Sequence, residues 1–388
     1  MKKDKSDIYI IDAIDMELAN SALNPHYIPN EELISEKYIE LISRAKRHEI
    51  LESFLLNLRK KTKLYDKEIS LQMGLCSMLS RKQLKELYLI NEQFEKNGIE
   101  YVLFKGFTSV YWKSCYVEEK ACTDFDILVN PGQVDEIYKI VKDMGYEMLG
   151  DREGNQCMKA LAWHGSAWNK KNFSIEIHHR YHNYGDNYQV NALPILERSM
   201  KGKVNDISFH VPSLEDHLLL LCIHMYHHEY RGMKFKLKYH KEIDNTIVNN
   251  NIDWDIFLEH VRECSANFAV MYSLYYCNEI YEQICGKRLL DKDILNKLEP
   301  KEFNIKKNQL SHRHFLDDRS FGDWDLYLIF WEKRFGEEWK GGYAQRLFSD
   351  EQYVAFRFYC LCFYYSVQNR WKDVCNEFGI EYEEKLFF

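Results

Sequence analysis

Residues 101–109 read Tyr-Val-Leu-Phe-Lys-Gly-Phe-Thr-Ser, and residues 123–129 read Thr-Asp-Phe-Asp-Ile-Leu-Val. The first stretch is a short apolar run that ends at a lysine and a glycine. The second is a strand-like run with aspartates at alternate positions. Because successive side chains of a β-strand point to opposite faces, Asp124 and Asp126 share one face. We therefore expect two carboxylates side by side, with the apolar residues of the same strand turned inward.

Two carboxylates held this close repel each other unless a cation lies between them, and a divalent cation is the usual one. Lys105 and Gly106 precede a predicted helix, whose first N–H groups and positive dipole end favour an anion such as a phosphate. A metal site beside a phosphate site favours phosphoryl or nucleotidyl transfer. The alternative interpretation of Asp124 and Asp126 is a solvent-exposed acidic strand end.

A third acidic residue lies on a later strand-like segment, residues 172–179. Ser174, Glu176 and His178 alternate there with two isoleucines, so the polar side chains share one face. Glu176 therefore has the parity needed to meet the two aspartates on a neighbouring strand. His178 lies on the same face, where it could position that acid or contact a phosphate.

The 388-residue chain is 46% hydrophobic and carries a formal net charge of -8, with a pI near 6.0. Its length predicts two or three domains with sizeable cores. The acidic balance makes a nucleic-acid partner unlikely without excluding a local basic groove. The notable basic runs, residues 59–63 and 234–241, are typical of solvated helix faces.

The eleven cysteines form neither a CxxC pair nor a regular spacing, so we expect reduced, buried thiols and a cytoplasmic protein. The N-terminus is polar and has no apolar segment behind it. No window reaches about 18 uncharged apolar residues. We therefore expect neither export nor a membrane partner.

The apolar periodicity predicts three regions. Residues 1–98 repeat apolar positions at spacings of three and four, which indicates helices. Residues 99–205 alternate between strands and helices, which indicates an α/β core. Residues 206–388 are helical again and end in an aromatic tail.

Finer expectations concern segment ends. Ser80 is the expected N-cap of a helix over residues 81–96, and Ser213 of a long apolar helix. Residues 158–163 are expected to form a strand. Residues 181–205 are expected to form a connecting loop with a short helix.

Three motifs occur in a fixed order in the predicted core: Leu103-Phe-Lys-Gly, Lys120-x-x-Thr-Asp-Phe-Asp-Ile-Leu-Val and Ile175-Glu-Ile-His. Together they resemble the polymerase β-type nucleotidyltransferase superfamily, and more narrowly its bacterial uncharacterised nucleotidyltransferase family. Pro212-Ser-Leu-Glu-Asp, Leu221-Cys-Ile-His and an acid at Asp244 extend the resemblance over about residues 80–265.

The resemblance implies an α+β fold, in which a small mixed-sheet core is flanked by N-terminal helices and a C-terminal helical domain. It implies a magnesium-dependent enzyme that moves a nucleoside monophosphate from an NTP such as ATP onto a hydroxyl group and releases pyrophosphate. The acceptor would be a small molecule, a peptide or a protein side chain. Asp124, Asp126 and Glu176 would hold two Mg²⁺ ions. Five residues would contact the nucleotide: Lys105, Gly106, Ser109, Lys120 and His178.

The chain departs from the family pattern at several positions. Phe107 follows the motif glycine, and Lys120 replaces an arginine, which removes the bidentate fork and leaves a point charge. Glu176 replaces an aspartate, and its longer side chain shifts where an ion would be held. His179 replaces a tryptophan.

Two other functions remain open. An RNA-directed nucleotidyltransferase would need a basic cleft. A catalytically degenerate protein would bind a nucleotide or a partner, as a toxin–antitoxin component does.

Other residue patterns have a plainer interpretation. His224 and His228 have helical i,i+4 spacing, but the chain has no His-Glu-x-x-His motif, so a buried hydrogen-bonded His224 is favoured over a zinc ligand. Trp163, Trp168 and Tyr181 could stack on a base, but ordinary packing is favoured in a chain this rich in aromatics.

Overall fold

The structure, a computed structural model, describes residues 13–117, 124–148, 166–170, 173–182, 188–231 and 235–298. Lys120, Trp163, the expected strand over residues 158–163 and the aromatic tail lie outside these ranges.

From Ala13 onward, the N-terminal region is helical, as expected. Its helices are α1 (Ala13–Leu23), α2 (Glu31–Arg47), α3 (Leu51–Lys61) and α4 (Asp66–Lys96). The prediction that Ser80 begins a new helix was wrong, because α4 runs through that residue without a break. The Ser80 hydroxyl donates to the Cys76 carbonyl oxygen at 3.0 Å, a common way for a serine inside a helix to satisfy its side chain.

Among the residues that the structure describes, the expected mixed sheet has five strands: β1 (Tyr101–Leu103), β2 (Asp124–Val129), β3 (Glu147–Met148), β4 (Ser166–Lys170) and β5 (Phe173–His178). Their order is β1-β2-β5-β4-β3. The central pair, β2 and β5, is parallel, and the other pairs are antiparallel. Two strands that are about fifty residues apart in the sequence therefore lie side by side at the centre.

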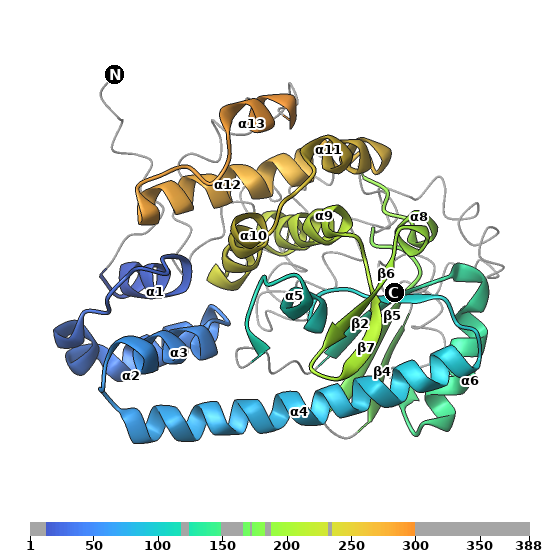
Figure 1. Cartoon of the computed structure of the whole chain (residues 1–388), viewed down its shortest axis with the longest axis horizontal. Helices are drawn as coiled ribbons and strands as arrows, with labels where there is room; N and C mark the ends of the chain where they lie inside the picture. The colour runs from blue at the N-terminus through green and yellow to red at the C-terminus, as the bar shows by residue number, and fades with distance from the viewer. Residues whose placement is uncertain are drawn as a thin grey trace, which may run out of the picture.

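One face of the sheet is apolar. Phe125, Ile127 and Ile175 pack there against Leu87 and Phe94 of α4, and α6 (Val134–Asp143) joins the same core. Figure 1 shows α4 running along the sheet toward α6. Strand alternation therefore leaves Asp126 and Glu176 on the opposite face.

The segment expected as loop and short helix is only partly so. The short helix is α8 (Ala192–Glu197), but an antiparallel hairpin follows it, with strands β6 (Met200–Val204) and β7 (Ile207–Val211). Its turn includes Asn205, which has a left-handed φ of 52°. Asparagine tolerates that conformation, so the Asn-Asp turn between apolar residues was a readable hairpin signal.

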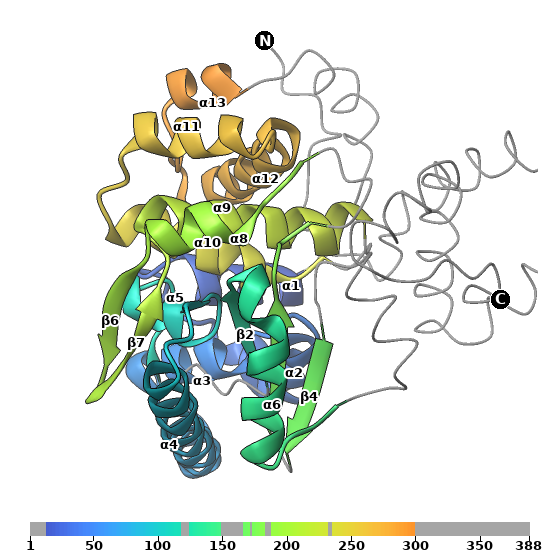
Figure 2. The ribbon, with the colours of Figure 1, turned by 90° about the vertical axis from the view of Figure 1, so that its right-hand side faces the viewer.

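The C-terminal region is helical in the part that the structure describes. Its elements are α9 (Leu214–Met225), the π-helical turn η3 (Tyr226–Arg231), α10 (Leu237–Asn249), α11 (Trp254–Glu263), α12 (Asn267–Cys285) and α13 (Lys292–Leu298). Ser213 caps α9, as expected, and accepts a bond from the Asp216 backbone N–H at 3.1 Å. The apolar α9 lies centrally, with α10, α11 and α12 packed around it (Figures 1 and 2). Asp244 on α10 is buried.

The described cysteines carry free thiols, as expected, and all but the half-buried Cys285 are buried. Across the described ranges, every helix is too short or too polar to cross a membrane.

Candidate active site

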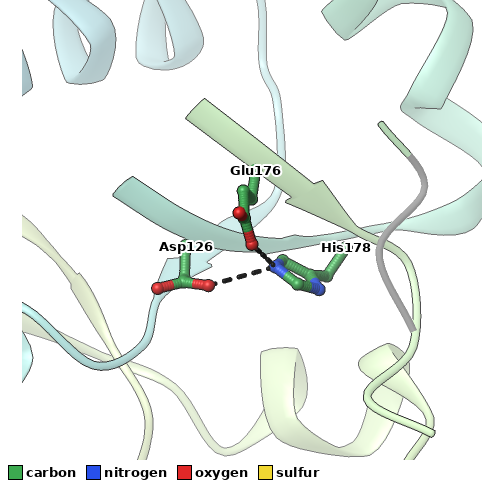
Figure 3. A group of neighbouring side chains, drawn as sticks. All are labelled: Asp126, Glu176 and His178. Atoms are coloured by element: carbon green, nitrogen blue, oxygen red, sulfur yellow. Dashed lines mark hydrogen bonds and ion pairs between the residues drawn. The ribbon is translucent and has the colours of Figure 1, made fainter. Parts of the chain in front are cut away.

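The pairing of β2 with β5 brings two acidic side chains together. Asp126 lies opposite Glu176 in the parallel register, and Leu128 lies opposite His178. The His178 Nε2 atom is 3.2 Å from Asp126 Oδ1 and 3.6 Å from Glu176 Oε2 (Figure 3). The expected parity of the third acid is therefore present in the fold.

Asp124 occupies a different position. It begins β2 opposite Ser174, and it is solvent-exposed, whereas Asp126 is only 7% exposed. Neighbouring protein atoms still crowd its carboxyl group. Desolvation raises the pKa of Asp124, and the charges of Asp126 and Glu176 raise it further, against the lowering effect of Lys105 and Lys238. Asp124 is thus an outer member of the acidic group.

Lys105 points to the acids. Its Nζ atom is 2.7 Å from Asp126 Oδ1, whereas the sequence suggested a phosphate as its partner. The backbone explains the direction of the side chain, because Lys105 has a left-handed φ of 64°. Gly106 follows with φ 54° and ψ −122°, a combination that glycine adopts and other residues avoid. The backbone turns sharply at these two residues, so the Lys105 side chain extends toward Asp126 on the sheet.

These contacts set the charge states of the site. Burial raises the pKa of Asp126, but the Lys105 ammonium and His178 outweigh burial and hold it well below its ordinary value. Burial alone would lower the pKa of His178, but hydrogen bonds to Asp126 and Glu176 raise it overall. Asp126 is therefore ionised, and the two side chains that contact its Oδ1 atom, Lys105 and His178, are basic groups.

The helix after Gly106 is shorter than expected. The apolar residues of the sequence predict a helix over residues 106–115, but α5 (Phe107–Tyr111) has only five residues. Ser109 lies inside this turn, fully buried, and its backbone N–H donates to the Gly106 carbonyl oxygen. Its Oγ atom has no hydrogen-bond partner among the described residues. The contact of Ser109 with a nucleotide stays a prediction.

A second set of side chains connects the acidic group to the C-terminal helices. The fully buried Tyr181 packs edge-on against Phe104 and His178, at ring distances of 5.0 Å and 6.0 Å. Its hydroxyl group lies 2.9 Å from His224 Nδ1 on α9. The packing interpretation of Tyr181 and the hydrogen-bonded interpretation of His224 therefore agree with the fold. Trp168 is likewise buried in the sheet core.

The donor atoms suit a divalent cation. Asp126, Glu176 and His178 each offer one ligand atom, and these atoms lie within 4.8 Å of one another. Two carboxylates provide the oxygen ligands that Mg²⁺ prefers, and the imidazole adds a donor suited to Mn²⁺. In the part of the chain that the structure describes, this is the one such group of three, so His224 and His228 gain no support as a zinc site.

These features define a class: an α+β protein whose two parallel central strands present adjacent acids on one face, covered by helices of the following region. The family described as uncharacterised nucleotidyltransferase matches residues 36–282, well over half of the chain. The chain belongs to this family, and it is therefore a transferase that acts on nucleotidyl groups.

Other similarities are weaker. The solution structure of the antibiotic-resistance factor ANT(2'')-Ia matches with a TM-score of 0.36 and 12% identity, over 51% of this chain and 96% of that one. No curated protein matches the sequence.

Proposed function

We propose that this chain is a magnesium-dependent enzyme that transfers a nucleoside monophosphate from an NTP to a hydroxyl group of a small molecule, a peptide or a protein. The observation that supports this proposal most is the pairing of Asp126 with Glu176 across two parallel strands. Family membership supports the same class of reaction.

In this proposal, Asp126 and Glu176 hold the metal, and Asp124 completes the acidic group at the strand start. Bound Mg²⁺ would neutralise phosphate charge and lower the pKa of the acceptor hydroxyl. Glu176 is half-buried and accessible, so it can accept the acceptor proton. The contact of His178 with Glu176 fixes the direction of that carboxylate.

Lys105 has two partners in the proposed cycle. In the structure it neutralises Asp126. If a bound metal neutralised Asp126 instead, the Lys105 ammonium group could contact a nucleotide phosphate. The tight turn at Gly106 lets the backbone approach the same phosphate. Ser109, Lys120 and His178 are proposed as further nucleotide contacts.

The same ion pair favours a second candidate function. A lysine that neutralises Asp126 permanently would leave a protein that binds nucleotides without transferring them. This candidate corresponds to the catalytically degenerate, nucleotide-binding protein that the sequence leaves open.

Asp126→Asn tests the proposal. The variant keeps the shape of the side chain and loses its charge, so nucleotide transfer should fall by about a hundredfold or more. Transfer is measured as pyrophosphate release and as the mass of one NMP added to the chain itself or to candidate acceptors. Asp143→Asn, an exposed acid at the end of α6, is the matched control. Stabilisation by Mg²⁺ and a non-hydrolysable NTP, with no transfer by the wild type, would instead support the second candidate.

A further inference from the structure

We propose that Lys236 and Lys238, at the start of α10, bind the terminal phosphates of the NTP, and that Glu49 occupies this phosphate site in the nucleotide-free protein. The proposal rests on the proposed function, because it assigns a part of the same nucleotide site. It adds a contribution from the N-terminal helices, to which the sequence assigned no chemistry.

The two lysines converge on one carboxylate. Lys238 Nζ is 2.8 Å from Glu49 Oε2, and Lys236 Nζ contacts Glu49 Oε1. Two ammonium groups around one carboxylate leave an excess positive charge. An oxyanion held by two ammonium groups is the arrangement that a phosphate requires.

Glu49 is held in place by the backbone. It lies between α2 and α3 with a left-handed φ of 53°. The preceding residue, His48, accepts a bond at 3.3 Å from the Lys238 backbone N–H. This contact joins the α2–α3 turn to the start of α10. The carboxylate therefore reaches the lysines from a different region of the chain.

This lysine pair lies near the acidic group. Lys105 lies over the Tyr181 ring at 5.6 Å, and the Tyr181 hydroxyl meets His224. The His224 ring contacts the ring of Tyr239, the neighbour of Lys238, at 5.1 Å. Lys238 is also close enough to Asp124 to affect its ionisation. A continuous series of contacts thus leads from Asp126 to the start of α10.

His224 and His228, which lie between the acidic group and the start of α10, add no positive charge. Burial lowers the pKa of His224 and His228 well below its ordinary value, and the neighbouring lysines lower it further. The positive charge on this side of the site therefore comes from lysine side chains. A triphosphate that reaches past the metal ligands would meet Lys236 and Lys238.

The carboxylate can be exchanged for a phosphate. The side chains of Lys236, Lys238 and Glu49 are 22%, 31% and 41% exposed, so a solute can reach them. Although desolvation opposes it, the two lysines hold the pKa of Glu49 at about 2, so this residue stays an anion at neutral pH. A terminal phosphate carries more charge and displaces it.

The test compares two probes by calorimetry: α,β-methylene-ATP and AMP, each with Mg²⁺. Lys238→Met should weaken α,β-methylene-ATP binding by about tenfold or more and leave AMP binding within about twofold, because AMP lacks the terminal phosphates. Lys236→Met should act in the same direction. Glu49→Gln should strengthen triphosphate binding by a few fold, since it removes the competing anion.

Two controls accompany these variants. Lys238→Arg keeps the charge and should retain most of the affinity. Lys201→Met removes a lysine from an exposed ion pair with Glu95 on the far helix α4 and should change nothing.

Equal binding of α,β-methylene-ATP by the wild type and both methionine variants would overturn the proposal, and so would an equal loss of AMP binding. In either case, loss of transfer in Asp126→Asn would leave the proposed function intact. Conversely, transfer that survives Asp126→Asn while Lys238→Met loses triphosphate affinity would overturn the proposed mechanism and support the lysine site.

Discussion

At the scale of single residues, the acidic group was readable because a strand alternates its side chains. That rule placed Glu176 and His178 on one face, and the register places them beside Asp126. The direction of Lys105 was not readable. It depends on a left-handed φ at a residue that is not glycine, and the fold around the turn imposes that conformation. The basic run around Lys238 was interpreted as a solvated face, but its pairing with Glu49 depends on tertiary packing.

Lys105→Met should separate the two roles of this lysine. Removing its positive charge next to Asp126 should raise Mn²⁺ affinity by about tenfold or more. Nucleotide transfer should fall in the same variant, because the phosphate loses a partner. Mn²⁺ affinity is measured by calorimetry without nucleotide, with Lys170→Met, which breaks the ion pair to Glu86, as the control. Unchanged Mn²⁺ affinity would show that Lys105 does not compete with the metal.

At the scale of elements, local signals predicted most helices and several strands, and missed features that depend on distant partners. Strand β4 was not expected, since its pairing between β3 and β5 gives it its place in the sheet. The continuity of α4 was missed because serine is a frequent N-cap, whereas here the Ser80 hydroxyl bonds to Cys76 within the helix and the following turns pack into the sheet core through Leu84 and Leu87. The parallel pairing of β2 with β5 could not be predicted from local signals, because it joins strands that are about fifty residues apart.

Gly106→Ala should damage the turn that directs Lys105. Its φ and ψ lie in a region that a Cβ atom disfavours, so the variant should lose about 1–3 kcal/mol of unfolding free energy. Transfer should fall strongly, because the turn also places the lysine.

Gly98→Ala is the matched control. Gly98 also has a positive φ, of 65°, and an added Cβ there meets nothing within 4 Å. This variant should cost about 1–2 kcal/mol and keep its activity. Urea unfolding measures the stability of both variants, and pyrophosphate release measures their transfer activity. Equal activity in the two variants would argue against a special role for the Gly106 turn.

At the scale of the whole molecule, one buried carboxylate ties several elements together. Asp216 on α9 is fully buried. It accepts two hydrogen bonds, at 2.9 Å and 3.1 Å, from Arg198, which lies between α8 and β6. His260 on α11 contacts the same carboxylate at 2.9 Å. This network joins the segment beside the sheet to the C-terminal helices. The domain boundary expected after residue 205 falls at the turn of the β6–β7 hairpin, and the division of the chain at 98 and 205 stays a prediction.

Asp216→Asn should lower the unfolding free energy at pH 7 by about 1–3 kcal/mol, because it removes the buried charge that accepts hydrogen bonds from Arg198, although Arg198 keeps its second partner, Glu263. Burial raises the pKa of Asp216, but His260 and Arg198 lower it overall. A depressed pKa stabilises the folded state above the unfolded value, and this contribution is lost as the pH falls through the folded pKa. The difference between wild type and variant should therefore shrink below about pH 4.

Urea unfolding at pH 7, 5 and 3.5 measures this change. Asp255→Asn, which removes an exposed ion pair with Lys297, should have little effect at any of these pH values. A wild-type to Asp216→Asn difference that stays constant with pH would contradict the assignment.

The contact of Lys105 with Asp126 has a practical consequence for handling the protein. Lys105 and His178 neutralise Asp126 from within the chain, so we expect folding not to depend on a supplied ion. Purification in a chelating buffer should therefore give native protein, ready to receive metal and nucleotide together. Magnesium would then bind together with the nucleotide and leave with the products at each turnover.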